Sequence, residues 1–306
     1  MTALDELVRD GAEPVKIADG ATWSEGPCWI PETSTVRWSD IHGDRILQHD
    51  LLTGATSVHR DGVEFTNGRT RRADGAIVQC SHGLRRIEVE RDGVVEPLVE
   101  RWSGGRFNSP NDVVVASDGA VWFTDPHYGI TVAGEGHPGE MEYGGCHVFR
   151  VDPETGEAEP MITDIAEPNG LAFSPDESVL HVSDTSAVRR PVGVGERRVV
   201  SYDVVREQGE QGRIRCTGGR TLFEIPAGIP DGIRVDEAGR IWSSAADGVH
   251  VYTDAGEHLG RIPVPEVVGN LCFGGADGRE LFIAATTGIY QLPVAVRDAT
   301  WSRIGG

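Results

Sequence analysis

Six side chains that carry an oxygen atom recur along this sequence at a regular interval. Each lies beside a glycine or a proline, in short segments such as SEGP, SPND, PNGL and PDGI. The six residues are Glu25, Asn67, Asn111, Asn169, Asp231 and Asn270. Carboxylate and amide oxygens are the donors that hard divalent cations prefer, and Ca²⁺ takes about six to eight of them. If the fold brings these side chains together, they could bind a divalent cation.

Two other interpretations of the six residues stay open at this point. Zinc usually prefers Cys or His, and none of the six is either, so zinc is the second choice of metal. Asn-Gly and Asp-Gly pairs are also common turn residues, which can explain any single one of the six. Six such residues in phase are harder to explain as turns, and Asn67 and Asn270 best fit a structural role.

The elements that must position these side chains repeat along with them. Successive segments are 42, 44, 58, 62 and 39 residues apart, and the short spacings match the ~40–50 residues of a four-stranded propeller blade. A turn and an apolar strand follow each segment, as in VRWSD, AVWFTD and VLHVSD. We therefore predict an all-β fold, a six-bladed β-propeller that forms one domain over residues 1–306. Innermost strands line the channel of a propeller, so the six side chains would meet at one mouth.

The N-terminal strand is predicted to close this ring. The sixth unit ends after IYQLPV, one strand short, whereas EPVK at residues 13–16 matches EPLV and EPMI, which form the last strands of other units. Closure by this strand would leave no unpaired edge. Residues 3–10 are predicted to form a short amphipathic helix. Insertions at residues 129–145 and 185–196 interrupt the repeat, and loops of this length are often lids or binding loops.

The composition argues against several classes of function. The chain has 48 acidic and 28 basic residues and a formal charge of −20, so we expect neither nucleic acid nor a membrane as a partner. No apolar window of ~18 residues and no signal-peptide pattern is present. The five cysteines form no CxxC pair, which favours reduced thiols and a cytoplasmic location. The absence of GxSxG, P-loop and GxGxxG motifs argues against an α/β-hydrolase and against nucleotide cofactors.

Four stretches of the chain, in order, resemble the gluconolactonase–regucalcin family of six-bladed propellers. They are SEGPCW, RFNSPNDVVVASDGAVWFTDPHYG, PNGLAFSPD and IPDGIRVDEAGRIW. The family also includes luciferin-regenerating enzyme, and the resemblance covers about residues 13–292. It implies one divalent metal in the channel, with Ca²⁺ as our first choice and Zn²⁺, Mn²⁺ or Mg²⁺ as alternatives. The metal ligands implied by the resemblance are Glu25, Asn111, Asn169 and Asp231.

The predicted activity is hydrolysis of a sugar lactone to the aldonic acid, a carboxylic ester hydrolysis. The metal would polarise the lactone carbonyl as a Lewis acid and stabilise the charge that develops on its oxygen. Asp231 is the predicted catalytic residue, because one carboxylate oxygen could bind metal while the other accepts a proton from water. Metal binding weakens a carboxylate as a base, so metal-bound hydroxide stays open as the alternative.

Further polar and aromatic side chains are predicted to bind the substrate. His82 ends the second strand of the second unit, and His42 and His127 occupy comparable places in their own units. RFN precedes SPND here, whereas in the regucalcin branch Arg-Phe-Asn runs straight into Asp-Gly without this three-residue insertion. The predicted substrate-binding residues are Asn67, His82, Arg106, Asn108, His127 and Tyr128.

Two other functions stay open for the same channel. One is a calcium-dependent regulatory or binding propeller without hydrolase activity. The other is organophosphate hydrolysis, because the same metal could polarise a P=O group and the family is distantly similar to diisopropyl-fluorophosphatase. A propeller that only recruits protein partners would not need acids and amides in phase at one mouth. The sequence predicts no particular oligomeric state.

Overall fold

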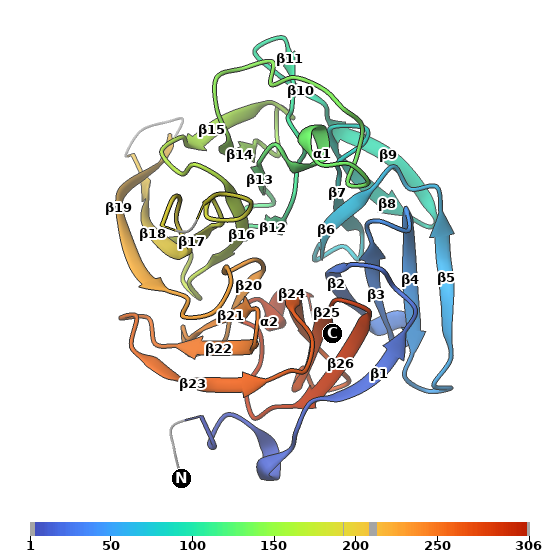
Figure 1. The fold of residues 1–306 in the computed structure, drawn as a ribbon. Helices are drawn as coiled ribbons and strands as arrows, with labels where there is room; N and C mark the ends of the chain where they lie inside the picture. The colour runs from blue at the N-terminus through green and yellow to red at the C-terminus, as the bar shows by residue number, and fades with distance from the viewer. Residues whose placement is uncertain (1–3, 192, 208–212, 305–306) are drawn as a thin grey trace.

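Six four-stranded antiparallel sheets surround a central channel in the computed structural model of the chain (Figure 1). The structure describes residues 4–191, 193–207 and 213–304. Five of the sheets use four strands in sequence order, and the sixth takes its outermost strand from the N-terminal region. The predicted all-β, six-bladed propeller closed by the N-terminal strand is thereby confirmed.

The blades follow one another around the ring in sequence order. Blade 1 contains β2 (Ser24–Ile30), β3 (Thr35–Asp40), β4 (Arg45–Asp50) and β5 (Thr56–Asp61). Blade 2 contains β6 (Thr66–Arg71), β7 (Ile77–Ser81), β8 (Arg86–Arg91) and β9 (Val94–Val99). Blade 3 contains β12 (Val113–Val115), β13 (Val121–Asp125), β14 (His147–Val151) and β15 (Ala158–Ile162).

The second half of the ring has the same organisation. Blade 4 contains β16 (Pro168–Phe173), β17 (Val179–Asp184), β18 (Arg198–Arg206) and β19 (Ile214–Glu224). Blade 5 contains β20 (Ile233–Val235), β21 (Ile241–Ala245), β22 (Gly248–Tyr252) and β23 (His258–Pro263). Blade 6 contains β24 (Val268–Gly274), β25 (Glu280–Ala285), β26 (Gly288–Pro293) and β1 (Val15–Asp19).

The remaining elements are short. A hairpin of β10 (Arg101–Trp102) and β11 (Gly105–Arg106) lies between blades 2 and 3. The helices are α1 (Tyr128–Thr131), α2 (Trp301–Ile304), and the 3₁₀ turns Arg9–Gly11 and Pro31–Thr33. Within the described residues, none of these helices has the length and apolar character needed to span a bilayer.

The ring closes where the blue strand β1 lies beside the red strand β26 in Figure 1. Glu266, in the turn before β24, holds this joint together. It accepts hydrogen bonds from Lys16 of β1 (2.8 Å), from the backbone N–H of Thr287 (2.8 Å) and from the Tyr290 hydroxyl (2.8 Å). Strand pairing and this polar cluster together attach the N-terminal strand to the last blade.

The segment before β1 differs from the helix expected at residues 3–10. Residues 4–7 form turns and Arg9–Gly11 form one 3₁₀ turn, while residue 3 lies outside the described residues. Val8 instead makes an isolated antiparallel bridge with Val294, and the Leu7 carbonyl accepts a hydrogen bond from Ala295 N–H (2.8 Å). A helix this short is marginal by itself, so pairing with blade 6 decides the backbone conformation.

The core lies between the blades. The second strands, such as β13 and β21, are buried along their whole length, because each packs against the next blade on one face and the previous blade on the other. Trp122 meets Phe173 of blade 4 edge-to-face with ring centroids 5.3 Å apart, and Trp242 meets Phe273 of blade 6 at 5.5 Å. These contacts fix the blades relative to one another, and so fix the side chains at the channel mouth.

Candidate functional site

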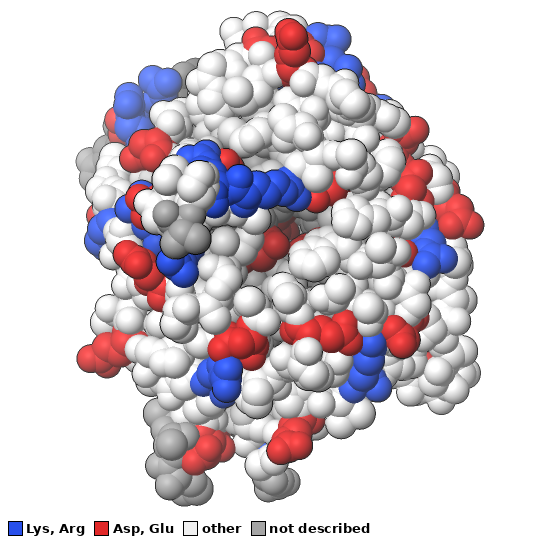
Figure 2. Space-filling model, viewed as in Figure 1, with Lys and Arg blue, Asp and Glu red and all other residues white. Residues whose placement is uncertain are grey.

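A cavity of about 400 Å³ opens at one mouth of the central channel. Five of the six recurring residues line it, and they come from five different blades. Figure 2 shows this face, with acidic side chains visible inside the central hollow and basic side chains along one edge of it. The five recurring residues in the lining are Glu25, Asn67, Asn111, Asn169 and Asp231. The structure therefore brings all four predicted metal ligands to one cavity.

The sixth recurring residue, Asn270 of β24, lies outside this lining. The residue is 2% exposed, and its Oδ1 accepts a hydrogen bond from Leu271 N–H (2.8 Å). A hydrogen bond from Asn270 to the Glu25 carboxylate favours the ionised form of Glu25. Asn270 therefore supports Glu25 and does not line the cavity itself, which agrees with the structural role expected from the sequence.

Backbone hydrogen bonds between neighbouring blades fix the positions of these side chains. The N–H of Gly68 donates to the Asn111 carbonyl (2.8 Å), and that of Gly170 donates to the Asp231 carbonyl (3.1 Å). Hydroxyl groups of the second strands add a further set of bonds. They run from Ser39 to the Asn67 carbonyl (2.9 Å), from Thr124 to the Asn169 carbonyl (2.6 Å) and from Ser183 to the Asp231 carbonyl (2.8 Å).

The glycines beside these residues allow the innermost strands to approach closely. A Cβ atom on Gly68 would lie 2.5 Å from the Asn111 carbonyl oxygen, and one on Gly170 would overlap the Asp231 carbonyl oxygen. Asn67-Gly68 lies within β6, and Asn169-Gly170 lies within β16. These pairs therefore serve the packing of strands around the channel and are not two-residue turns.

Negative charge is concentrated in this cavity. Burial, and the nearby charges of Asp231 and Asp112, raise the pKa of Glu25 well above its usual value. Burial, Asp112 and Glu135 raise the pKa of Asp231 to about 8. Each carboxylate destabilises the charge of its neighbours, because all lie in a weakly screened space. A cation bound here would relieve that repulsion.

The donor set fits a hard divalent cation. Two carboxylates would neutralise a dication, and two amides would add uncharged oxygen atoms. In the described part of the chain, no three His, Cys, Asp or Glu side chains converge in an arrangement that could hold a metal. The group that fits is therefore the mixed carboxylate and amide set of Glu25, Asn111, Asn169 and Asp231.

Comparison with known proteins identifies the family. A family model described as "SMP-30/Gluconolactonase/LRE-like region" matches residues 23–287, which is most of the chain. The chain belongs to this family. A gluconolactonase from Zymomonas mobilis is 31% identical over 94% of this chain and 83% of that protein. A pentonolactonase from Haloferax volcanii is 31% identical over 86% of this chain and 81% of that protein.

A solved structure agrees with this assignment. The structure of a gluconolactonase from Xanthomonas campestris is 38% identical in sequence, with a TM-score of 0.86. The alignment covers 96% of this chain and 93% of that one. Both the fold and most of the length of this family member are therefore shared with a gluconolactonase.

Two of the predicted substrate-binding residues line the cavity of this family member, and a third supports them. Asn67 and Tyr128 are in the lining. His82 lies behind Asn67, with Nδ1 2.9 Å from the Glu135 carbonyl and Nε2 3.2 Å from Asn67 Nδ2. Because Nδ1 faces a carbonyl it must carry the proton, so Nε2 accepts from the Asn67 amide. Burial lowers the pKa of His82, which favours this neutral form. Within the described residues, no hydrogen bond engages Asn67 Oδ1.

The structure does not bring the other three predicted substrate-binding residues to the cavity. Arg106 donates to the Leu84 carbonyl (3.3 Å). Asn108 is fully buried and donates to the carbonyls of Asp125 (3.1 Å) and Gly145 (3.0 Å). The third, His127, precedes α1, and its Nδ1 lies 3.4 Å from the Cys146 sulfur. The Asn108 and His127 side chains therefore contact residues at the end of the first insertion, and the Arg106 side chain contacts blade 2.

Some lining residues were absent from the predicted site. Glu135 and Arg189 line the cavity from the two insertions, and His42 lines it from blade 1. The length of the insertions was the signal in the sequence, but irregular loops have no periodicity that would select these two residues. Asp112, beside Asn111, was also missed. It is buried below the cavity, where its carboxylate accepts from Arg234 (3.3 Å).

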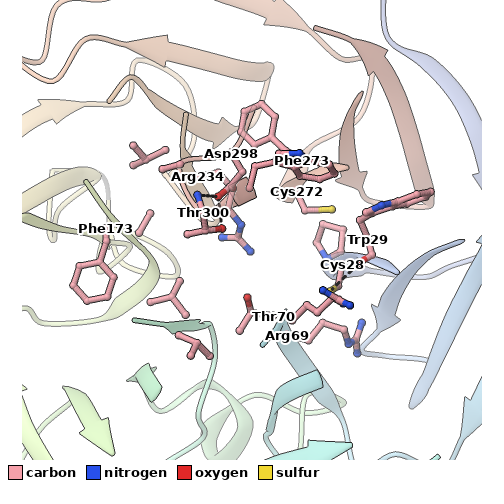
Figure 3. Close-up of a pocket in the computed structure, with 18 residues that line it drawn as sticks. Cys28, Trp29, Arg69, Thr70, Phe173, Arg234, Cys272, Phe273, Asp298 and Thr300 are labelled. Carbon is pink, nitrogen blue, oxygen red and sulfur yellow. Dashed lines mark hydrogen bonds between the residues drawn. The ribbon is translucent and has the colours of Figure 1, made fainter. Parts of the chain in front are cut away.

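The same innermost strands line a second cavity, of about 90 Å³, farther along the channel. Its residues follow the recurring ones in sequence, so it lies toward the opposite mouth. Figure 3 shows that the side chains here are of a different kind, with guanidinium, thiol and aromatic groups around the space. They include Cys28, Trp29, Arg69, Phe173, Arg234, Cys272 and Phe273. The C-terminal residues Asp298–Trp301 also line this cavity, so the tail lies across that end of the channel.

Proposed function

We propose that this protein hydrolyses the ring ester of a sugar lactone, with a divalent metal bound at the mouth of the channel. One observation carries the proposal: carboxylates and amides from five blades line a single cavity of about 400 Å³. The relatives that share most of its length include a gluconolactonase and a pentonolactonase, which supports a sugar lactone as the substrate.

Glu25, Asn111, Asn169 and Asp231 are the residues that would hold the metal. All four present oxygen donors, which favours Ca²⁺, with Mg²⁺, Mn²⁺ and Zn²⁺ as alternatives. A dication bound there would polarise the lactone carbonyl and stabilise the oxyanion that forms during attack.

Asp231 is the proposed general base. Its backbone N–H donates to Ser244 Oγ (2.9 Å), and its carbonyl accepts from Gly170 N–H (3.1 Å), so its backbone is held in place. Its carboxylate accepts a proton from the attacking water while the water oxygen bonds to the carbonyl carbon. The ring C–O bond then breaks, and the same proton passes to the departing ring oxygen. The product is the open-chain hydroxy acid.

Asn67 and Tyr128 are proposed to orient the lactone. His82 holds the Asn67 amide so that Oδ1 can accept a hydrogen bond from a sugar hydroxyl. The Tyr128 hydroxyl is already engaged, because it donates to Glu167 (3.0 Å) and contacts Thr185. Tyr128 therefore offers its ring as a wall of the cavity, and its hydroxyl takes no part in the chemistry.

The proposal is tested with Asp231→Asn, which keeps the shape of the side chain and removes its charge. We expect kcat for D-glucono-1,5-lactone, followed with a pH indicator, to fall about 10²- to 10⁴-fold, and a chelator to abolish the activity of the unmodified protein. Asp203→Asn, on the outer part of blade 4, serves as the control. Unchanged hydrolysis after both chelation and Asp231→Asn would refute the mechanism. Metal binding without hydrolysis of any lactone would favour a non-enzymatic binding protein.

A further inference from the structure

The two insertions meet above the cavity through an ion pair. Arg189 Nη2 lies 2.8 Å from Glu135 Oε1. Glu135 belongs to the first insertion, in blade 3, and Arg189 belongs to the second, in blade 4. Both side chains line the same cavity as Asp231. A charged pair carried by two loops therefore faces the space where a substrate would bind.

Glu135 is held by contacts from three other blades. Its backbone carbonyl accepts from His82 Nδ1 of blade 2 (2.9 Å). Its carboxylate lies 2.8 Å from Arg189 of blade 4 and 3.9 Å from His42 Nε2 of blade 1. Its side chain is only 15% exposed. A carboxylate fixed in this way still has lone pairs that can accept from a ligand hydroxyl.

Arg189 has an unusual backbone conformation. Its φ is +60°, in the left-handed region that non-glycine residues seldom adopt. Its guanidinium carbon lies 5.6 Å from the centre of the Tyr128 ring. The next residue, Arg190, donates to Glu167 (2.6 Å), which also accepts from the Tyr128 hydroxyl (3.0 Å). One network thus fixes both Arg189 and the aromatic wall beside it, and backbone strain of this kind is concentrated at functional sites.

A guanidinium beside a carboxylate matches the chemistry of a sugar hydroxyl. The hydroxyl can accept from the first group and donate to the second. Arginine has five N–H donors, and within the described residues the one side-chain hydrogen bond of Arg189 goes to Glu135. Other parts of the wall, including Ile41, Val188 and Ile229, are apolar. These apolar residues provide contact area but cannot distinguish a ring with hydroxyl groups from one without.

We propose that Glu135 and Arg189 are specificity-determining residues that bind the ring hydroxyl groups of a polyhydroxylated lactone. This inference rests on the proposed function for the reaction, but the binding that it describes does not require hydrolysis. The two insertions would then select sugar lactones over simple aliphatic lactones, and residues on the blades would carry out the reaction.

The test compares two lactones that share a six-membered ester ring. D-glucono-1,5-lactone carries hydroxyl groups and δ-valerolactone carries none. Arg189→Met and Glu135→Gln should each lower kcat/KM for gluconolactone about 10- to 100-fold, chiefly through KM. For δ-valerolactone the change should stay below about 3-fold. Equal losses for both substrates, or no loss for either, would overturn the inference.

A control variant separates this effect from a general loss of surface charge. Arg220→Met removes a half-exposed ion pair with Asp203 (2.9 Å) on the outer part of blade 4, and it should leave both rates unchanged. Thermal unfolding of each variant shows whether the protein remains folded.

A binding measurement separates the inference from the proposed reaction. 1,5-Anhydro-D-glucitol has the ring and hydroxyl groups but no carbonyl, and calorimetry should show its Kd rising at least about 10-fold in both variants. If the unmodified protein opens no lactone yet binds this polyol through Arg189 and Glu135, hydrolysis is refuted and the inference stands. If it opens both lactones equally well and the two variants bind the polyol unchanged, the inference is refuted and hydrolysis stands.

Discussion

The two ends of the channel are built from the same innermost strands and differ in chemistry. At one mouth the strands present carboxylates and amides around an open cavity. A few residues later the same strands present arginine, cysteine and aromatic side chains, and the C-terminal segment lies across that end. The buried pair of Asp112 and Arg234 lies between the two ends.

This difference shows how one strand can serve two purposes. The open mouth holds acids whose charges repel one another in a buried space, which destabilises the fold in the absence of a cation. The covered end holds apolar contacts and paired charges, which stabilise the fold. Substitutions at the open mouth should therefore lower activity more than stability, and substitutions at the covered end should lower stability more than activity.

The largest expected effect is on activity at the open mouth. Glu25→Gln removes one of the two carboxylates proposed to hold the metal, and we expect lactone hydrolysis to fall at least about 100-fold. In metal-free protein the same change should raise Tm by about 1–3 °C, because it removes an acid whose ionisation is opposed in the folded state by burial and by Asp231 and Asp112. Calorimetric unfolding in chelator checks the second part. A lower Tm would show that these acids do not repel one another.

The covered end should show the reverse behaviour. Trp301 of α2 is partly buried against the core of blades 1 and 6 and covers Gly278. Trp301→Ala should destabilise the protein by about 2 kcal/mol, whereas kcat/KM for lactones should change less than about 2-fold. Denaturant unfolding and kinetics on the same sample measure both. A large loss of activity without a loss of stability would show that the far end takes part in the reaction.

A smaller effect, on stability alone, is expected at Glu266, an acid whose neighbours are hydrogen-bond donors. Burial alone would raise its pKa, but hydrogen bonds from Lys16, Thr287 and Tyr290 outweigh burial and lower the pKa to about 2, against an unperturbed value of 4.5. The resulting stability is present above pH 4.5 and is lost as the pH falls from 4.5 towards 2.

Glu266→Gln should therefore remove about 1–2 kcal/mol at pH 7, and the difference from the unmodified protein should shrink as the pH approaches 2. Urea unfolding across that pH range provides the measurement. A difference that does not change with pH would mean that the ionisation of Glu266 does not stabilise the joint between β1 and blade 6.

The sequence predicted what repeats in the fold. Because each blade needs the same strand pattern and the same close approach at the channel, the spacing of the six recurring residues predicted the number of blades. The same spacing predicted that Glu25, Asn111, Asn169 and Asp231 meet at one mouth. The N-terminal strand could be placed because one strand was missing from the sixth unit.

What does not repeat was harder to predict. Arg106 and Asn108 precede a lining residue in sequence, but proximity along the chain does not say which way a loop side chain points. Arg106 binds Leu84 of blade 2 instead, and Asn108 binds Gly145 at the end of the first insertion. Glu135 and Arg189 reach the cavity through loops without periodicity. The helix expected at residues 3–10 does not form, because Leu7 and Val8 pair with Ala295 and Val294 instead. Local helix propensity does not report a tertiary contact of this kind.

The most direct test of the account is the number of metal ions bound per chain, measured by equilibrium dialysis alongside lactone hydrolysis. We expect one divalent ion per chain in the unmodified protein, with Ca²⁺ as the first candidate. The ion and the activity should be lost together when Glu25→Gln, Asn111→Leu, Asn169→Leu or Asp231→Asn is introduced. Full hydrolysis by metal-free protein, or one ion still bound tightly by all four variants, would contradict it.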